Sequence, residues 1–208
     1  MTKVMQVLLV RHLAAVTVLL PLCALAICFA LSLYLHFDVV NRTHCLVYNF
    51  FPSVSSAAGK FSPQKFIWRA LLALHLAPRF LLGYLTAGYL ARQAGLVGVA
   101  FVGSLEHYSL HACSFVVFLV ASEAHMVLLT ALLRRSFRWK LRLLLCNAVC
   151  LANAVYLFVR HNTHCEPGVY SLFAIFEICL VLSNMAFHFT SYWDFYDLQL
   201  CVGSVSQD

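Results

Sequence analysis

Long apolar runs alternate with short polar segments along the whole chain of 208 residues. Five of these runs are long enough for a helix that crosses a hydrocarbon core of about 30 Å at about 1.5 Å per residue. They cover residues 13–35, 66–90, 112–133, 141–159 and 169–190. The pattern predicts an all-α fold, a polytopic transmembrane helix bundle that forms a single membrane domain over residues 1–208.

A shorter apolar segment decides how many times the chain crosses the membrane. Residues 94–105, "AGLVGVAFVGSL", are twelve in number and include three glycines, which makes the segment short for a span. It crosses if the bilayer thins around it or if its small side chains pack closely against neighbouring helices, and it is re-entrant otherwise. We predict six spans with this segment as a short third span, and five spans if it does not cross.

Basic residues predict the orientation of the chain in the membrane. The loop at residues 134–140 is strongly basic, and Lys3 and Arg11 precede the first apolar run. Because positive charge gathers on the cytosolic side, we expect this loop and both termini in the cytosol. With six spans, a first loop at residues 36–65 and a last loop at residues 160–168 then share the lumenal face. With five spans they face opposite compartments.

The composition supports a membrane protein and excludes other classes. Hydrophobic residues make up 62% of the chain and charged residues 11%, whereas a soluble domain is about half apolar and about a quarter charged. The net charge is +6, but the basic residues form no patch with interleaved aromatic residues, so no nucleic-acid partner is predicted. Ala24-Leu25-Ala26 resembles a signal-peptide cleavage site, yet the apolar run continues to Leu35 and therefore predicts a span.

The two lumenal loops both contain Thr-His-Cys, in "NRTHC" at residues 41–45 and "HNTHC" at residues 161–165. On a shared lumenal face, Cys45 and Cys165 are the favoured disulfide pair, with Cys113 as the competing partner. A zinc site is the alternative, and its ligands would be His44, Cys45, His164 and Cys165. Asn41-Arg42-Thr43 is an N-glycosylation sequon, which a cell can use on the lumenal side.

Polar side chains inside the apolar runs are the candidates for chemistry, because each one needs a partner or a cavity there. His75 and Arg79 share one helix face in the second run, and the pair suits a lipid phosphate. Glu177, Asn184 and His188 form one stripe in the last run, with Glu177 as the natural counter-charge for Arg79. Two alternatives remain open: an ion pair that holds helices together beside hydrogen-bonding Asn147, Asn153, Asn184 and His125, or a ligand cavity.

Other motifs carry less chemistry. The segment "PSVSSAAGKFSP" at residues 52–63 contains three serines without a nucleophile elbow and is expected to form an ordered loop. The chain shows no P-loop, dinucleotide fingerprint or zinc-protease motif, and we expect no bound cofactor and no metal. Asp194, in the aromatic stretch "YWDF", is expected to cap a helix or to pair at the cytosolic boundary.

Two long stretches resemble the family of post-GPI-attachment-to-proteins factor 2. They are "THCLVYNFFPSVSSAAGKFSPQKFIWRALLALHLAPRF" at residues 43–80 and "RHNTHCEPGVYSLFAIFEICLVLSNMAFHFTSYWDF" at residues 160–195, supported by "HMVLLTALL" in the fourth span. The chain departs from the family pattern at the short third span, as a divergent paralogue or a shortened form would.

The resemblance implies a multi-pass protein of the Golgi membrane that cycles with the endoplasmic reticulum. Its implied task is the lipid remodelling of GPI anchors, in which the lyso-anchor is reacylated with a saturated fatty acid from an unidentified donor. Arg79, Glu177 and Asn184 would then bind the phosphoinositol headgroup, and His75 or His188 would act as general base. The expected partners are GPI-anchor lipids, the bilayer and other remodelling enzymes. The alternative is a non-catalytic factor that presents the anchor to a separate acyltransferase.

Overall fold

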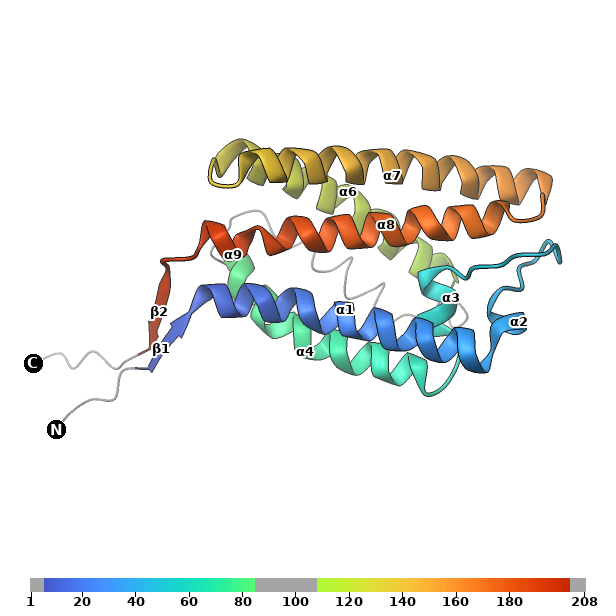
Figure 1. Cartoon of the computed structure of the whole chain (residues 1–208), viewed down its shortest axis with the longest axis horizontal. Helices are drawn as coiled ribbons and strands as arrows, with labels where there is room; N and C mark the ends of the chain where they lie inside the picture. The colour runs from blue at the N-terminus through green and yellow to red at the C-terminus, as the bar shows by residue number, and fades with distance from the viewer. Residues whose placement is uncertain (1–5, 85–107, 203–208) are drawn as a thin grey trace, which may run out of the picture.

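The computed structural model describes residues 6–84 and 108–202, and these residues are mostly helical (Figure 1). A short strand stands at each end of the described chain, which the sequence did not predict. In chain order the elements are β1 (Gln6–Leu9), α1 (Val10–Leu35), α2 (Phe37–Val40), α3 (Val54–Gly59), α4 (Gln64–Tyr84), α6 (Tyr108–Leu132), α7 (Phe137–His164), α8 (Val169–Phe189), α9 (Ser191–Asp194) and β2 (Gln199–Val202).

Four of the described helices are long and apolar enough to cross a membrane: α1, α6, α7 and α8, the last continued to Asp194. They correspond to the first, fourth, fifth and sixth predicted spans. Helix α4 begins two residues before the predicted second span, and residues 85–90 of that span lie outside the described residues. Residues 94–105 lie outside them as well, so the six-span count stays a prediction.

The long helices pack as two close pairs with a fifth helix across them. Helices α1 and α4 lie side by side, as do α7 and α8, and α8 also contacts α1. Helix α6 runs obliquely behind α7 and α8 in Figure 1 and packs against α7. The apolar residues of α1, α6 and α8 are spread around each helix and not gathered on one face, which is expected where one side faces protein and the other lipid.

Buried polar side chains join these helices. Asn147 of α7 donates from Nδ2 to the carbonyl oxygen of Leu180 at 2.8 Å and to Ser183 Oγ at 2.7 Å on α8. Asn184 of α8 donates to Ser122 Oγ of α6 at 2.6 Å. These two interhelical roles were predicted. Asn153 instead donates to the carbonyl of Val149 in its own helix, so that prediction was wrong.

The two ends of the described chain meet at one end of the bundle. Strands β1 and β2 pair antiparallel, with Gln6 opposite Val202 and Leu9 opposite Gln199 (Figure 1). At this end Lys140 Nζ lies 2.6 Å from Asp194 Oδ2, and both side chains are almost fully buried, at 0% and 2% exposure. The pairing expected of Asp194 is therefore present, and its partner comes from the basic loop and the start of α7.

The opposite end carries the two Thr-His-Cys loops. Gly168 precedes α8 in the left-handed conformation with a φ of 77°, and its N–H donates to the carbonyl of Tyr48 at 2.8 Å. This bond joins the last loop to the first. Within the first loop, Ser53 caps α3 by accepting from the N–H of Ser56, so the segment expected to be a loop contains a short helix.

Candidate functional site

A cavity of about 130 Å³ between α1, α3, α4, α6 and α8 brings the predicted site residues together. All five line it: His75, Arg79, Glu177, Asn184 and His188. Two helices far apart in the chain supply them: α4 supplies His75 and Arg79, and α8 supplies Glu177, Asn184 and His188. The rest of the lining is mainly apolar, which makes polar groups in this cavity strong partners for a ligand.

On the α4 side, His75 is held between a backbone carbonyl and Arg79. Its Nδ1 lies 2.7 Å from the carbonyl oxygen of Thr17 on α1, so Nδ1 carries the proton and donates. Its Nε2 then accepts from Arg79 Nη1 at 3.4 Å. His75 is 1% exposed and Arg79 8%. The imidazole therefore orients the guanidinium beside the cavity.

On the α8 side, Glu177 is bonded to the first loop and not to Arg79. Its Oε2 accepts from the N–H of Val54, the first residue of α3, at 2.8 Å, and the side chain is 6% exposed. The ion pair that the sequence suggested between Arg79 and Glu177 is absent from the described contacts, although both residues line the same cavity. Glu177 thus positions α3 over the cavity.

The two remaining predicted residues lie deeper on α8, facing α6. Besides its bond to Ser122, Asn184 Nδ2 lies 3.4 Å from Met126 Sδ. The His188 ring lies 5.7 Å from the ring of His125, centroid to centroid. Both residues join helices and line the cavity at once, so a replacement that keeps packing is needed to separate these roles.

A second cavity of about 590 Å³ adjoins the first on the side of the Thr-His-Cys loops. The two share four lining residues: Ser55, His111, Phe115 and Glu177. Arg42, Lys60 and His161 supply polar groups to the larger cavity, and its other wall is apolar and comes from α6, α7 and α8. Burial and the nearby Arg42 guanidinium lower the pKa of Lys60 from its usual value.

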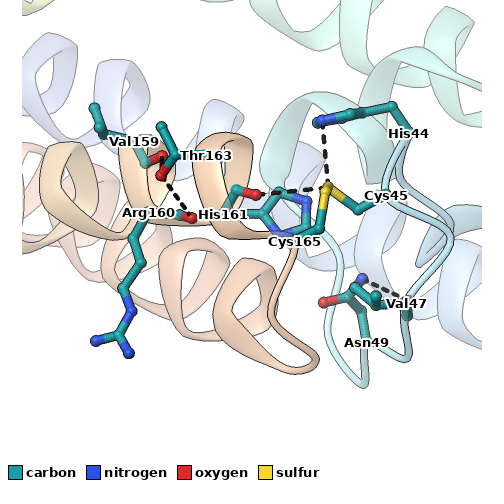
Figure 2. The surroundings of a disulfide bond; sticks show 9 residues. All are labelled: His44, Cys45, Val47, Asn49, Val159, Arg160, His161, Thr163 and Cys165. Atoms are coloured by element: carbon teal, nitrogen blue, oxygen red, sulfur yellow. Dashed lines mark hydrogen bonds between the residues drawn. A yellow bond between two sulfur atoms is a disulfide. The ribbon is translucent and has the colours of Figure 1, made fainter.

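A disulfide joins Cys45 to Cys165 beside the larger cavity, with 5.3 Å between the Cα atoms (Figure 2). This is the pair that the sequence favoured, and Cys113 remains a free thiol. His44 Nε2 lies 3.3 Å from Cys45 Sγ and donates to it, since a disulfide sulfur carries no hydrogen. The ligand atoms of His44, Cys45 and Cys165 lie within 4.8 Å of one another, but bonded sulfurs offer no thiolate, so the zinc alternative does not fit.

The sequon asparagine is turned inward. Asn41 is 4% exposed, and its Nδ2, the atom that would carry a glycan, donates to the carbonyl oxygen of Phe37 at 2.9 Å. Glycosylation would have to precede this packing or break the bond. Modification of Asn41 stays a prediction that the folded arrangement disfavours.

Sequence reasoning missed the polar residues of the larger cavity. These residues lie in or next to the loops, where a polar side chain needs no special explanation because water can solvate it. They are His161, Lys60, Ser55 and His111. The signal that could have found them was the repeated polar motif, since two loops joined by a disulfide enclose the residues around it.

Comparisons with known proteins identify the family of the chain. The family model for the Frag1/DRAM/Sfk1/Cwh43P N-terminal domain matches residues 10–94 and 85–198. "Post-GPI attachment to proteins factor 2" of Drosophila melanogaster is 39% identical over 91% of this chain and 87% of its own length. The chain belongs to the post-GPI attachment to proteins factor 2 family.

Other members of this family are similar over the same extent. "Acyltransferase PGAP2" of Xenopus tropicalis is 34% identical over 90% of this chain and 88% of its own length, and "Post-GPI attachment to proteins factor 2" of Caenorhabditis elegans is 37% identical over 89% and 85%. The two matches to the family model overlap at residues 85–94. No solved structure matches the chain.

Proposed function

We propose that this protein remodels the lipid of GPI anchors in the Golgi, as the acyltransferase that reacylates the lyso-anchor with a saturated fatty acid. The observation that carries the proposal is the cavity in which all five predicted polar residues meet, in a chain whose relatives are named for GPI attachment and, in two cases, for acyl transfer. Such a cavity between membrane helices is accessible to a lipid headgroup.

The residues divide into two roles. Arg79, fixed by His75, binds the phosphate of the phosphoinositol headgroup, because a buried guanidinium makes strong charge-assisted hydrogen bonds to phosphate oxygens. Glu177 accepts hydrogen bonds from inositol hydroxyls, and Asn184 donates hydrogen bonds to them. His188 accepts the proton of the attacking hydroxyl as general base, and His75 is the second candidate for this role once a ligand draws Arg79 away.

Two contacts support the six-span topology that places this cavity toward the lumen. The pairing of β1 with β2 brings both ends of the described chain to one side, and the disulfide brings the first and last loops together. Because the two partners of each contact lie on the same side of the membrane, the chain between them must cross the membrane an even number of times. With the basic loop at residues 134–140 on the side of the paired ends, the termini are cytosolic and the disulfide is lumenal.

A non-catalytic role is the second candidate, and one observation favours it. Both nitrogens of His75 are engaged, and Asn184 bonds to Ser122, so a good part of the polar set serves packing in the absence of ligand. A protein of this kind would bind the anchor and present it to a separate acyltransferase among the other remodelling enzymes.

The saturated fatty-acid content of anchors tests the proposal, measured by mass spectrometry in cells that lack the endogenous factor and express a variant. His188→Gln and His75→Gln keep hydrogen bonding but cannot take up a proton at neutral pH, and we expect normal expression with unsaturated or lyso anchors. Arg79→Met should weaken anchor binding and give the same phenotype. Saturated anchors at the wild-type level in all three variants would rule out this cavity as the working site.

A further inference from the structure

We propose that the larger cavity binds the acyl donor and that the donor is a membrane glycerophospholipid, held by its phosphodiester at the loop end with a fatty-acid chain along α6 and α7. This inference rests on the proposed acyl transfer and names its second substrate. Its volume of about 590 Å³ lies within the range of about 300–1,000 Å³ that is usual for cavities enclosing small ligands. The smaller cavity, at about 130 Å³, has no room for a fatty-acid chain.

The loop end of the larger cavity is built for an anion. Arg42 and Lys60 both line it, and burial together with the charge of Arg42 lowers the pKa of Lys60. Two cations that line one cavity repel each other, and an anion bound there would relieve the repulsion. Lys60 Nζ also donates to the carbonyl oxygen of Val39 at 2.7 Å, which fixes the ammonium in place. Among the described lining residues the one carboxylate is Glu177, which is engaged by Val54.

Two buried polar groups beside these cations lack partners within the described residues. His161 is 1% exposed, and neither ring nitrogen makes a hydrogen bond there; the ring meets His44 edge-on and lies tilted against Tyr170. Thr43 Oγ1 is likewise buried and unbonded. Leaving such groups unsatisfied costs about 1–3 kcal/mol each, so a site that holds both beside two cations fits a ligand with several acceptor oxygens.

The rest of the cavity suits a fatty-acid chain. Its wall includes apolar side chains of α6 and α7: Val116, Leu119, Leu151, Val155 and Phe158. Val116 is 57% exposed and Val155 54%, on helices that are long and apolar enough to cross the membrane. The cavity therefore borders the lipid-facing surface, and a bilayer lipid can enter it sideways.

These features favour a phospholipid over a water-soluble thioester donor. Two cations suffice for one phosphodiester, whereas a nucleotide-based donor carries several phosphates, for which the described cavity lining offers no lysine or arginine beyond Arg42 and Lys60. The cavity also lies beside the disulfide, at the end of the bundle opposite the paired termini.

The chemistry balances with a phospholipid as donor. The free hydroxyl oxygen of the lyso-anchor forms a bond to the ester carbonyl carbon of the donor, and the bond from that carbon to the donor's glycerol oxygen breaks. The proton of the attacking hydroxyl passes to the departing glycerol oxygen, and the products are the acylated anchor and a lysophospholipid. Ser55, His111 and Glu177 line both cavities, so the ester of the donor can pass from the larger cavity into the smaller one, which His75 and His188 line.

Photolabelling tests the site without relying on transfer. The full chain is reconstituted in vesicles of a phosphate-free galactolipid that contain a small fraction of phosphatidylcholine with a diazirine in one acyl chain, irradiated and digested for mass spectrometry. We expect label on the cavity-facing residues of α6 and α7. Leu151→Trp, which fills the cavity, should remove most of this label, whereas Leu145→Trp, on the exposed surface of the same helix and outside the cavity lining, should not.

The anion site has its own variants. His161→Phe keeps the ring but removes both nitrogens, and we expect it to lower specific labelling about tenfold, as the loss of one charge-assisted hydrogen bond would. Arg42→Gln with Lys60→Gln should do the same, with Arg138→Gln as the control in the basic loop. Retention of the disulfide and a monodisperse elution profile establish that each variant is folded.

Competition identifies which lipid the cavity holds. Unlabelled phosphatidylcholine should displace the probe, and lysophosphatidylinositol, which mimics the acceptor, should not. Displacement by lysophosphatidylinositol alone would overturn the proposal by assigning the cavity to the anchor, and label spread evenly over all lipid-facing helices would overturn it by showing no site. Specific labelling without any transfer activity would instead leave this site standing and sink the proposed function.

Discussion

Glu177 offers the sharpest separation between a structural and a chemical role. Its carboxylate is nearly buried, accepts one hydrogen bond from the N–H of Val54 and lines both cavities. Glu177→Gln keeps an oxygen that can accept this bond but removes the charge. Glu177→Leu removes both. The two variants therefore differ in the contact that holds α3, and they share the loss of the carboxylate.

The expected magnitudes follow from these contacts. In Glu177→Leu the N–H of Val54 loses its acceptor, which should cost about 1–3 kcal/mol of stability, minus whatever the new apolar side chain regains. In Glu177→Gln the bond remains and a buried charge is no longer desolvated, so stability should stay within about 1 kcal/mol of wild type. Both variants should fail to restore saturated anchors, because neither offers a carboxylate to the headgroup.

Thermal unfolding of the purified full chain in detergent measures the first effect, and anchor fatty-acid analysis in cells measures the second. Glu123→Gln is the matched control: Glu123 is a half-buried glutamate of α6 that lines neither cavity, so this variant should keep full function. A stable Glu177→Gln protein that restores saturated anchors would refute the role of the carboxylate. Equal stability of the Gln and Leu variants would refute the role of the Val54 contact.

The remaining predictions concern the two ends of the bundle. Lys140→Met or Asp194→Leu alone should destabilise the protein by about 3–5 kcal/mol, because each leaves a buried charge without its partner. The double variant should recover most of that stability in the same unfolding assay, and additive losses in the double variant would contradict the ion pair. Cys45 and Cys165 should resist thiol labelling until a reductant is added, while exposed Cys113 labels at once; free labelling of Cys45 would disprove the disulfide. Protease added to sealed vesicles should cut tags at both termini or at neither, and cutting at one terminus alone would exclude an even number of spans.

Much of the fold follows from local pattern, since a long apolar run in a membrane protein has little choice but to be a helix. Helices α1, α6, α7 and α8 begin and end within a few residues of their predicted runs. Helix α3 was missed because its six residues carry no apolar period, and it depends on a cap by Ser53 and on the distant Glu177.

The candidate site was predictable to the extent that polar residues in apolar runs must face something other than lipid. His75, Arg79 and Glu177 therefore line one cavity as expected, but Arg79 and Glu177 are not the ion pair that their opposite charges suggested. Glu177 instead accepts from the backbone N–H of Val54, 123 positions away in the chain. The pattern of side chains in a sequence gives no sign of such a backbone donor. His161 was not predicted as a site residue either, because it is buried by loops that meet only in the folded protein.

Transfer by the purified chain is the most direct test of the account. The full-length protein is reconstituted in liposomes with a lyso-GPI-anchored protein and phosphatidylcholine that carries an isotope-labelled stearoyl chain, and both lipids are then analysed by mass spectrometry. We expect labelled, fully acylated anchor together with an equal amount of lysophosphatidylcholine, both abolished in Glu177→Gln and preserved in Glu123→Gln. Anchor that stays unacylated with the pure protein, yet is acylated when membranes lacking this protein are added, would contradict it and assign the chemistry to another enzyme.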